Sequence, residues 1–406
     1  MTAGRHTAAR SIDDSRHDSV VHRAKWIVCD PWTVIPDGYV HIEQGEIREA
    51  GRGNFRGQVS MIDHGEGVIF PQTVNAHTHL ELSALKGCLD TGRGFDVWVR
   101  DLLCKRDQME IQTLVDMAEA ETLKLIGSGC GAVGEISTLG ITRDIVRDSG
   151  LAGVWFREFL GDQLPDTAIP VKTGTDLSMS MAGHAPHTTS PDVLTAIKNS
   201  TRLQGLPFSL HLAESLDEVH FLETASGPWK DFLVSRGINP ASWGLPATSP
   251  VRYVNDMGIL DHRTILVHLL HADDTDMEIV SRSGAYVCIC PRSSQTIHQR
   301  LPNLEKMLKA GIRLCLGTDS LASVGSLSIQ DEMAFTAQRF PLTSPETILQ
   351  MATLGGAQAL GLEHYMGSLI PGKSARLAFA PIQTTRAADV VESIIHSRGT
   401  HSIQLP

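Results

Sequence analysis

The sequence has few of the groups that build disulfide frameworks. Seven cysteines occur among 406 residues, their number is odd, and no two have the CxxC spacing. A small scaffold held by disulfides is therefore not expected, and free thiols in a reducing compartment are the interpretation that fits. The seven are Cys29, Cys88, Cys104, Cys130, Cys288, Cys290 and Cys315.

Two further absences limit the partners. No apolar run approaches the ~18 residues that a membrane-spanning helix needs, and no secretory signal is recognisable near the start. Basic residues are fewer than acidic ones, 35 against 46, so the formal net charge is −11. Because nucleic-acid backbones and anionic membranes attract basic surfaces, neither is an expected partner, whereas a single nucleoside is not excluded. We expect a cytoplasmic protein.

The two ends of the chain differ in character from its middle. Residues 1–18 are polar, and we expect them to be loose. Residues 19–66 and 366–406 both consist of short strand patterns separated by turn residues. We expect these two stretches to pair into one small accessory domain of the β-sandwich type. Residues 67–365 would then form the main domain.

Eight short apolar runs alternate with helical patterns in the middle segment. This alternation is typical of a parallel sheet, and eight strands with intervening helices make a (β/α)8 barrel, or TIM barrel. One long helix is expected over residues 96–126, and residues 226–250 are a long insertion that we interpret as a lid or substrate-facing element. The runs are 67–77, 130–137, 152–161, 177–186, 207–215, 263–272, 285–293 and 312–320.

Polar residues follow the predicted strands at the point where each strand ends. His77 and His79 are two residues apart, so on a strand their side chains would face the same side. The reactive side chains of a barrel lie at the carboxyl ends of its strands, which would bring further groups to the same rim. Imidazoles with a carboxylate suit Zn²⁺, or alternatively Fe²⁺. The groups at other strand ends are His211, His268 and Asp319.

These segments resemble the amidohydrolase superfamily, in its branch of cytosine-, guanine- and adenosine-type aminohydrolases. The resemblance covers nearly the whole chain. The matching segments are PQTVNAHTHLE (71–81), HAPHTTSP (184–191), HLAES (211–215), VHLLH (267–271), CPRS (290–293), GTDSLAS (317–323) and TLGGAQALGLEHYMGSLIPGKSA (353–375).

Carried over residue by residue, the resemblance implies one divalent metal ion, Zn²⁺ before Fe²⁺, and a catalytic group around it. Glu214 would move protons to and from the substrate, His268 would orient the attacking water, and Asp319 would accept a proton from it. The fourth predicted strand ends in His184 and carries no lysine there, which disfavours the two-metal members of the superfamily. The metal ligands would be His77, His79, His211 and Asp319.

Four further residues are candidates for substrate binding. His184 lies in the loop that carries substrate contacts in this branch, and Trp98 could stack on a planar ring or pack in the core. Glu81 could contact the substrate or serve a buried hydrogen-bonding role. Arg157 could bind a substrate carboxylate with two hydrogen bonds, or pair with a neighbouring glutamate.

The resemblance implies a hydrolytic deaminase of a 6-aminopurine nucleoside. HTHLELSALKG, REFLG and GTDSLAS are most like the aminodeoxyfutalosine deaminases of menaquinone biosynthesis, whose substrate carries a benzoate. The alternatives are S-adenosylhomocysteine or methylthioadenosine deamination, then guanine deamination or triazine hydrolysis. A different class, an inactive barrel that serves as an interaction protein, also stays open. Relatives are commonly dimers, so a homodimer is allowed.

Overall fold

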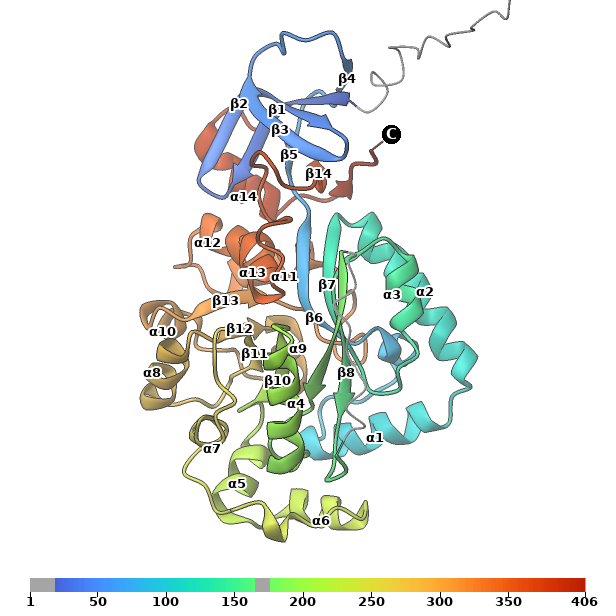
Figure 1. Ribbon diagram of the computed structural model, residues 1–406, viewed down its shortest axis with the longest axis vertical. Coiled ribbons are helices and arrows are strands. Elements are labelled where there is room, and N and C mark those ends of the chain that lie inside the picture. Colours follow the sequence, from blue (N-terminus) through green and yellow to red (C-terminus); the bar gives the residue numbers. More distant parts are fainter. Residues whose placement is uncertain (1–18, 165–175, 406) are drawn as a thin grey trace, which may run out of the picture.

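The computed structural model describes residues 19–164 and 176–405, so the expectation for residues 1–18 lies outside the described part. Figure 1 shows an elongated arrangement with a mixed sheet at one end, a barrel-like body in the middle, and α5 and α6 at the other end. None of the helices in the described part of the chain is long and apolar enough to cross a bilayer.

Eight parallel strands follow one another in sequence order around the body, as the eight apolar runs predict. The sheet nearly closes on itself, because Asn75 on the first strand donates to Thr318 after the last one at 2.8 Å, and Thr78 forms a parallel bridge with Asp319. This arrangement is that of a (β/α)8 barrel. The strands are β6 (Thr73–Thr78), β7 (Cys130–Ser137), β8 (Ala152–Phe159), β9 (Leu177–Gly183), β10 (Phe208–Leu212), β11 (Thr264–His268), β12 (Tyr286–Ile289) and β13 (Arg313–Leu316).

Helices lie between and outside these strands. Ser190 caps one of them by accepting a hydrogen bond from the backbone N–H of Val193, and a proline follows it in the first turn, as expected for a helix start. The helices are α1 (Phe95–Asp107), α2 (Ile111–Gly127), α3 (Arg143–Asp148), α4 (Pro191–Leu203), α5 (Leu216–Thr224), α6 (Pro228–Ser235), α7 (Pro250–Asp256), α8 (Asp274–Ser283), α9 (Pro291–His298), α10 (Leu304–Lys309), α11 (Ile329–Arg339), α12 (Pro345–Gln350), α13 (Gly356–Ala359) and α14 (Val390–Ile395).

The single helix expected over residues 96–126 is two helices. Gln108 ends α1, and Glu110, in an extended conformation, precedes α2. The break has a consequence for the site, because α2 packs on the barrel beside β7 whereas α1 turns toward α9 at the carboxyl ends of the strands. Figure 1 shows α1 and α6 at this end of the body.

A separate mixed sheet contains strands from both ends of the chain. Its order is β15-β14-β5-β1-β2-β3, with β4 paired to β1. The first predicted run, 67–77, is divided between the two sheets: β5 pairs with β1 and β14, and after Pro71 the N–H of Thr73 turns to Gly129 beside β7. The strands are β1 (Ser19–Asp30), β2 (Thr33–Glu43), β3 (Glu46–Arg52), β4 (Ser60–Asp63), β5 (Val68–Pro71), β14 (Leu377–Ala380) and β15 (His401–Ser402).

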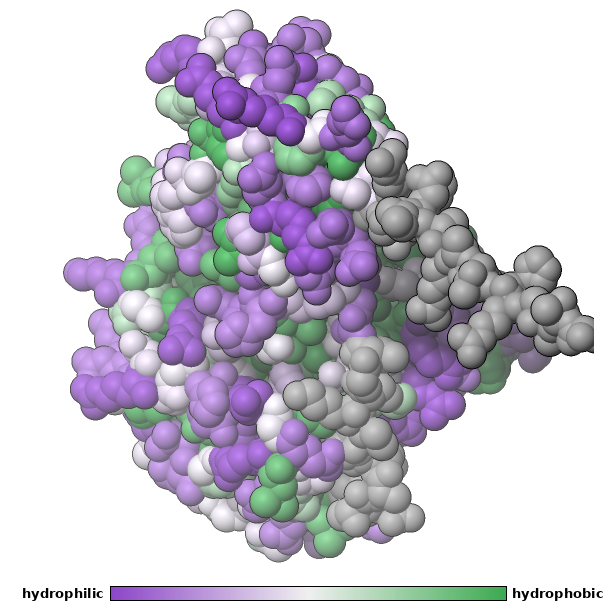
Figure 2. All heavy atoms as spheres, turned by 45° about the horizontal axis from the view of Figure 1, so that its top comes forward, coloured by the Kyte–Doolittle hydropathy of each residue, from purple (hydrophilic) through white to green (hydrophobic). Residues whose placement is uncertain are grey.

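The largest apolar cluster of the described residues joins the strands to the helices around them and includes Phe208, Leu210 and Leu266, all fully or almost fully buried. A second cluster holds other strand residues, among them Ile265 and Val267. The surface is different in character. Figure 2 shows hydrophilic side chains over most of one face, with hydrophobic ones in small separate groups. The core therefore holds the strands in place, and the strand ends are free to carry polar groups.

Candidate metal centre and active site

Three imidazoles and one carboxylate converge at the carboxyl ends of β6, β10 and β13. The Nε2 atom of His77 lies 3.1 Å from Nε2 of His79 and 3.2 Å from Nε2 of His211. Oδ1 of Asp319 lies 3.8 Å from Nε2 of His77 and 3.6 Å from that of His79. His77 near the end of β6 and His79 directly after that strand lie together, and closure of the barrel adds the other two residues.

The donor set fits one metal ion. Four ligands about 2.0–2.2 Å from a tetrahedral ion lie about 3.3–3.6 Å from one another. The four separations given above lie between 3.1 and 3.8 Å. Burial lowers the pKa of His77 to about 4, so its imidazole is neutral at physiological pH. Burial would raise the pKa of Asp319, but the neighbouring His77 and His79 outweigh it and lower that pKa below its usual range. Neutral imidazoles and an ionised carboxylate are the ligand forms that Zn²⁺ requires.

The second carboxylate oxygen of Asp319 is fixed by hydroxyl groups. Ser293 on α9 donates to Oδ2 at 2.5 Å and Ser323 donates to it at 3.1 Å. Oδ1 is left facing the imidazoles. The backbone is strained at this position, with φ of 60°, and His268 has φ of 75°. Such left-handed conformations in residues other than glycine concentrate at functional sites, where the fold enforces the geometry.

Glu214 lies between two histidines and is not among the four converging groups. Its Oε1 is 3.0 Å from Nε2 of His298 and 3.5 Å from Nε2 of His268. Burial would raise the pKa of Glu214, but His268 and His298 outweigh it and lower that pKa below its usual range. The backbone N–H groups of Ala213 and Glu214 both donate to the buried carboxylate of Glu218, which holds this turn.

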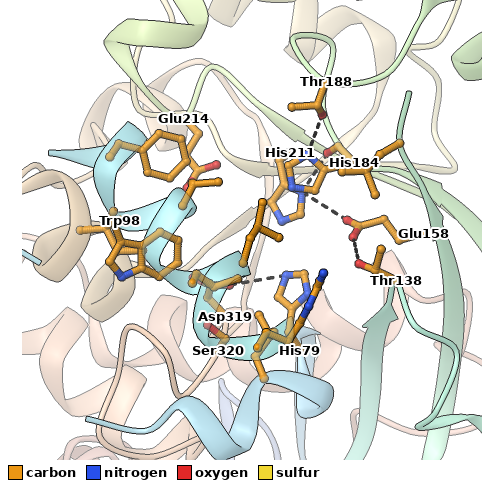
Figure 3. A pocket seen from close by; sticks show the side chains of 18 of the residues that line it. His79, Trp98, Thr138, Glu158, His184, Thr188, His211, Glu214, Asp319 and Ser320 are labelled. Atoms are coloured by element: carbon orange, nitrogen blue, oxygen red, sulfur yellow. Dashed lines mark hydrogen bonds and ion pairs between the residues drawn. The ribbon is translucent and has the colours of Figure 1, made fainter. Parts of the chain in front are cut away.

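The outer nitrogen of His211 also has defined neighbours. Its Nδ1 lies 2.8 Å from the carbonyl oxygen of His184, an arrangement that requires an N–H there and leaves Nε2 free to bind metal. Oε1 of Glu158 is 3.8 Å from the same nitrogen, and Thr138 donates to Oε2 of Glu158 at 2.6 Å. Burial raises the pKa of Glu158 to about 7. Figure 3 shows these groups on one side of the cavity.

An apolar cavity adjoins the converging groups. His79, His211, Asp319, Glu214 and His268 form its polar floor. Its aromatic wall comes from two helices, with Phe95 and Trp98 on α1 and Trp229 and Phe232 on α6. The 226–250 insertion therefore contributes directly to the cavity. A largely apolar cavity with aromatic walls and a few polar groups on its floor is suited to a planar ring.

Three of the four substrate-binding candidates line this cavity: Glu81, Trp98 and His184. Nδ1 of His184 pairs with the hydroxyl of Thr188 at 2.7 Å, which sets the orientation of the ring. Both carboxylate oxygens of Glu81 are engaged by the loop after β7, with Ser137 donating at 2.7 Å and the N–H of Thr138 at 2.9 Å. Glu81 therefore shapes the wall of the cavity as well as bordering it.

Arg157 does not line the cavity. On β8 adjacent side chains point to opposite faces, so Glu158 faces the cavity whereas the guanidinium of Arg157 lies next to Gly140 in the loop after β7. Arg106 on α1 borders the cavity instead, with 13% of its side chain exposed. Nothing in the sequence pointed to Arg106 or His298, because both lie on helices and no local pattern marks which face of those helices meets the site.

Comparison with known proteins identifies the family to which the chain belongs. Residues 68–395 match the model of the amidohydrolase family. An aminodeoxyfutalosine deaminase of Deinococcus radiodurans is 28% identical over 318 residues, which are 72% of this chain and 73% of the relative. A 5-methylthioadenosine/S-adenosylhomocysteine deaminase of Nitratidesulfovibrio vulgaris is 28% identical over 369 residues, 82% of this chain and 77% of the relative.

Solved structures show the same fold. The aminofutalosine deaminase of Helicobacter pylori in complex with methylthio-coformycin has a TM-score of 0.81 at 23% identity, with 93% of this chain and 96% of that chain covered. An adenosine deaminase of Xanthomonas campestris with bound zinc has a TM-score of 0.75 at 19% identity, with 93% and 89% covered. The expectation of a metal-dependent hydrolase is confirmed, and the chain belongs to the amidohydrolase family.

Proposed function

We propose that this protein hydrolytically deaminates a 6-aminopurine nucleoside. The observation that carries the proposal is the pairing of a metal-competent cluster with a separately held carboxylate, Glu214, on the floor of one apolar cavity. A metal cluster alone would fit many hydrolases of the family. A carboxylate that borders the same cavity without joining the cluster supplies the proton donor that an aromatic ring needs when it loses its aromaticity.

The metal ligands in this proposal are His77, His79, His211 and Asp319, and the ion is Zn²⁺, with Fe²⁺ as the alternative. The bound ion supplies Lewis acidity that makes water nucleophilic near neutral pH. His268 points at the same space from β11 and orients the attacking water, which the short separation of its ring from those of His77 and His211 allows.

Proton transfers in the reaction fall to the two carboxylates. Both carboxylates are ionised at rest, so Glu214 first takes one proton from the attacking water and delivers it to the ring nitrogen adjacent to the carbon that bears the amino group. As the hydroxyl adds to that carbon, Asp319 accepts the remaining hydroxyl proton and passes it to the amino group, which leaves as ammonia. Both carboxylates are then ionised again. The products are a hypoxanthine nucleoside and ammonia, so one water is consumed and no redox partner is required.

Substrate contacts in this proposal come from the cavity walls. Trp98 stacks on the purine, His184 donates or accepts through its Nε2, and Glu81 holds the loop after β7 that borders the cavity. Aminodeoxyfutalosine, which carries a benzoate, is the first candidate, because the Deinococcus radiodurans relative has that activity in its name. Arg106 takes the carboxylate-binding role that was one of the two alternatives for Arg157.

The second candidate substrates are S-adenosylhomocysteine and methylthioadenosine, which the Nitratidesulfovibrio vulgaris relative's name favours. Guanine deamination and triazine hydrolysis come after these.

We further propose that residues 19–66 and 366–406 form an accessory β domain beside a catalytic barrel of residues 67–365, that the protein acts in the cytoplasm, and that it works as a homodimer. Nucleic acid and membrane are not partners in this proposal.

The test is incubation of the purified, metal-loaded protein with these nucleosides, while the absorbance change from adenine to hypoxanthine is recorded. Turnover of at least one adenosine derivative, with release of one ammonia per nucleoside, is expected. No turnover of any of them would refute the proposal. If metal analysis also finds no bound ion after reconstitution, the inactive-barrel alternative is favoured.

A further inference from the structure

Glu214 is contacted by a histidine that has no part in the reaction as described so far. Nε2 of His298 lies 3.0 Å from Oε1 of Glu214, closer than Nε2 of His268 at 3.5 Å. Both contacts converge on the same carboxylate oxygen. Oε2 of Glu214 is thus the oxygen left to meet a substrate in the adjoining cavity.

His298 is well placed to be a rigid support. It is the last residue of α9, and Gln299, in the left-handed conformation with φ of 49°, ends the helix directly after it. Its side chain is 6% exposed, and its ring packs on that of Phe95 at 4.8 Å. The imidazole therefore reaches Glu214 from a helix end, with its own orientation set by an aromatic neighbour.

The same helix also holds Asp319. Ser293, in the first turn of α9, donates to Oδ2 of Asp319 at 2.5 Å, and His298, in the last turn, meets Glu214 at 3.0 Å. One helix thus contacts both carboxylates that the proposed reaction uses. It fixes their separation and leaves one oxygen of each, Oδ1 of Asp319 and Oε2 of Glu214, free to act.

We propose that His298 is a positioning residue, whose Nε2–H holds the carboxylate of Glu214 in the orientation needed for proton transfer to the substrate ring. It does not border the cavity and so does not touch the substrate itself. A glutamate side chain has three rotatable bonds, and a proton donor misplaced by about 1 Å loses about 100-fold in rate. This inference rests on the proposed deaminase function.

A pair of amide variants separates the hydrogen bond from simple packing. A glutamine side chain can place its amide nitrogen where Nε2 of histidine lies. The asparagine side chain is shorter by one carbon, so its amide nitrogen does not reach Glu214. We expect H298Q to keep kcat within about threefold of the wild type and H298N to lower kcat about 10–100-fold. KM should change less than threefold in both, and both should hold as much metal as the wild type.

A matched control is available on the same helix. Gln295 accepts a hydrogen bond from Arg339 at 2.8 Å on the exposed side of α9, so Q295A tests whether any disturbance of the helix lowers activity. We expect its kcat to stay within twofold of the wild type. Equal kcat values for H298Q and H298N, or an equal loss in Q295A, would overturn the proposal.

Crystal structures of the two variants keep this test separate from the proposed function. A wild type that deaminates no nucleoside refutes the function alone. In that case the position of Glu214 in the two crystal structures tests the role of His298. The carboxylate of Glu214 should keep the wild-type orientation in H298Q and turn away from it in H298N. A carboxylate in the same place in both variants would overturn the role of His298.

Discussion

The Nε2 atoms of His77 and His211 lie 3.2 Å apart, although 134 residues separate the two histidines in the chain. Two neutral imidazoles that face each other at this distance share a single hydrogen bond, whereas an ion between them would satisfy both nitrogens. This relationship makes metal binding and folding of the strand ends interdependent.

The first prediction therefore concerns metal removal. Chelation should lower the thermal midpoint, since an ion that binds only the folded state stabilises it by about 4 kcal/mol at a concentration 1,000 times its Kd. His211→Asn should retain less than a tenth of the bound metal and lose activity by more than about 1,000-fold. Elemental analysis and calorimetry measure these effects. The exposed His364 offers a control variant, H364N, and full metal occupancy in H211N would contradict the assignment.

The second prediction concerns Glu214. Because its carboxylate borders the cavity but is not among the converging ligands, Glu214→Gln should keep the metal and lower kcat by about 100–10,000-fold. Glu223 on α5 is exposed, and Glu223→Gln is the matched control, expected to behave like the wild type. Steady-state kinetics gives kcat for each variant, and metal analysis of the same samples gives the amount of bound ion. Loss of metal from E214Q would instead identify Glu214 as a ligand.

The third prediction concerns Arg106, which borders the cavity with one edge of its guanidinium bonded to Asp107 at 2.9 Å. For a nucleoside that carries a carboxylate, Arg106→Gln should raise KM about 10–100-fold, the effect of losing one charged hydrogen-bonded pair. KM for the uncharged methylthioadenosine should be unchanged. Arg93, whose side chain is 61% exposed, provides the control R93Q. An equal rise for both substrates would show that Arg106 only supports the fold.

The fourth prediction concerns pH and the mixed sheet. Nδ1 of His22 lies 3.0 Å from Nε2 of His64, and burial lowers the pKa of His22 to about 4 from its usual 6.5. Below pH 6.5 the unfolded chain binds a proton that the folded chain refuses, so stability is lost as the pH falls from about 6.5 to about 4. The whole shift corresponds to roughly 3 kcal/mol.

Urea unfolding at several pH values measures this loss. His22→Phe removes the titrating group. Between pH 7 and pH 4.5 the free energy of unfolding of this variant should therefore fall less than that of the wild type, whatever the stability of the variant at pH 7. H364N again serves as the control and should keep the wild-type slope. If the free energy of unfolding of H22F and of the wild type fell equally with pH, His22 would have the same pKa in the folded and unfolded chains, and the prediction would be wrong.

Much of the barrel could be predicted from the sequence because its signals are local. Alternating apolar runs and helical patterns gave eight strands in the observed order, and the two-residue spacing of His77 and His79 placed both on one face. Pairing partners were harder to predict. The run 67–77 is continuous in hydrophobicity, yet it divides after Pro71 because the neighbouring strands on each side belong to different sheets.

The sequence by itself determined the strand pattern, the family and the groups at the strand ends, since all of these depend on residue types at short spacings. Only the tertiary structure decided which side chains from helices reach the site. Arg106, and not Arg157, borders the cavity because α1 turns across the strand ends while β8 directs Arg157 away. His298 meets Glu214 across 84 residues because the last residue of α9 lies beside the turn that follows β10. Such contacts follow from how helices pack, and packing depends on the whole chain.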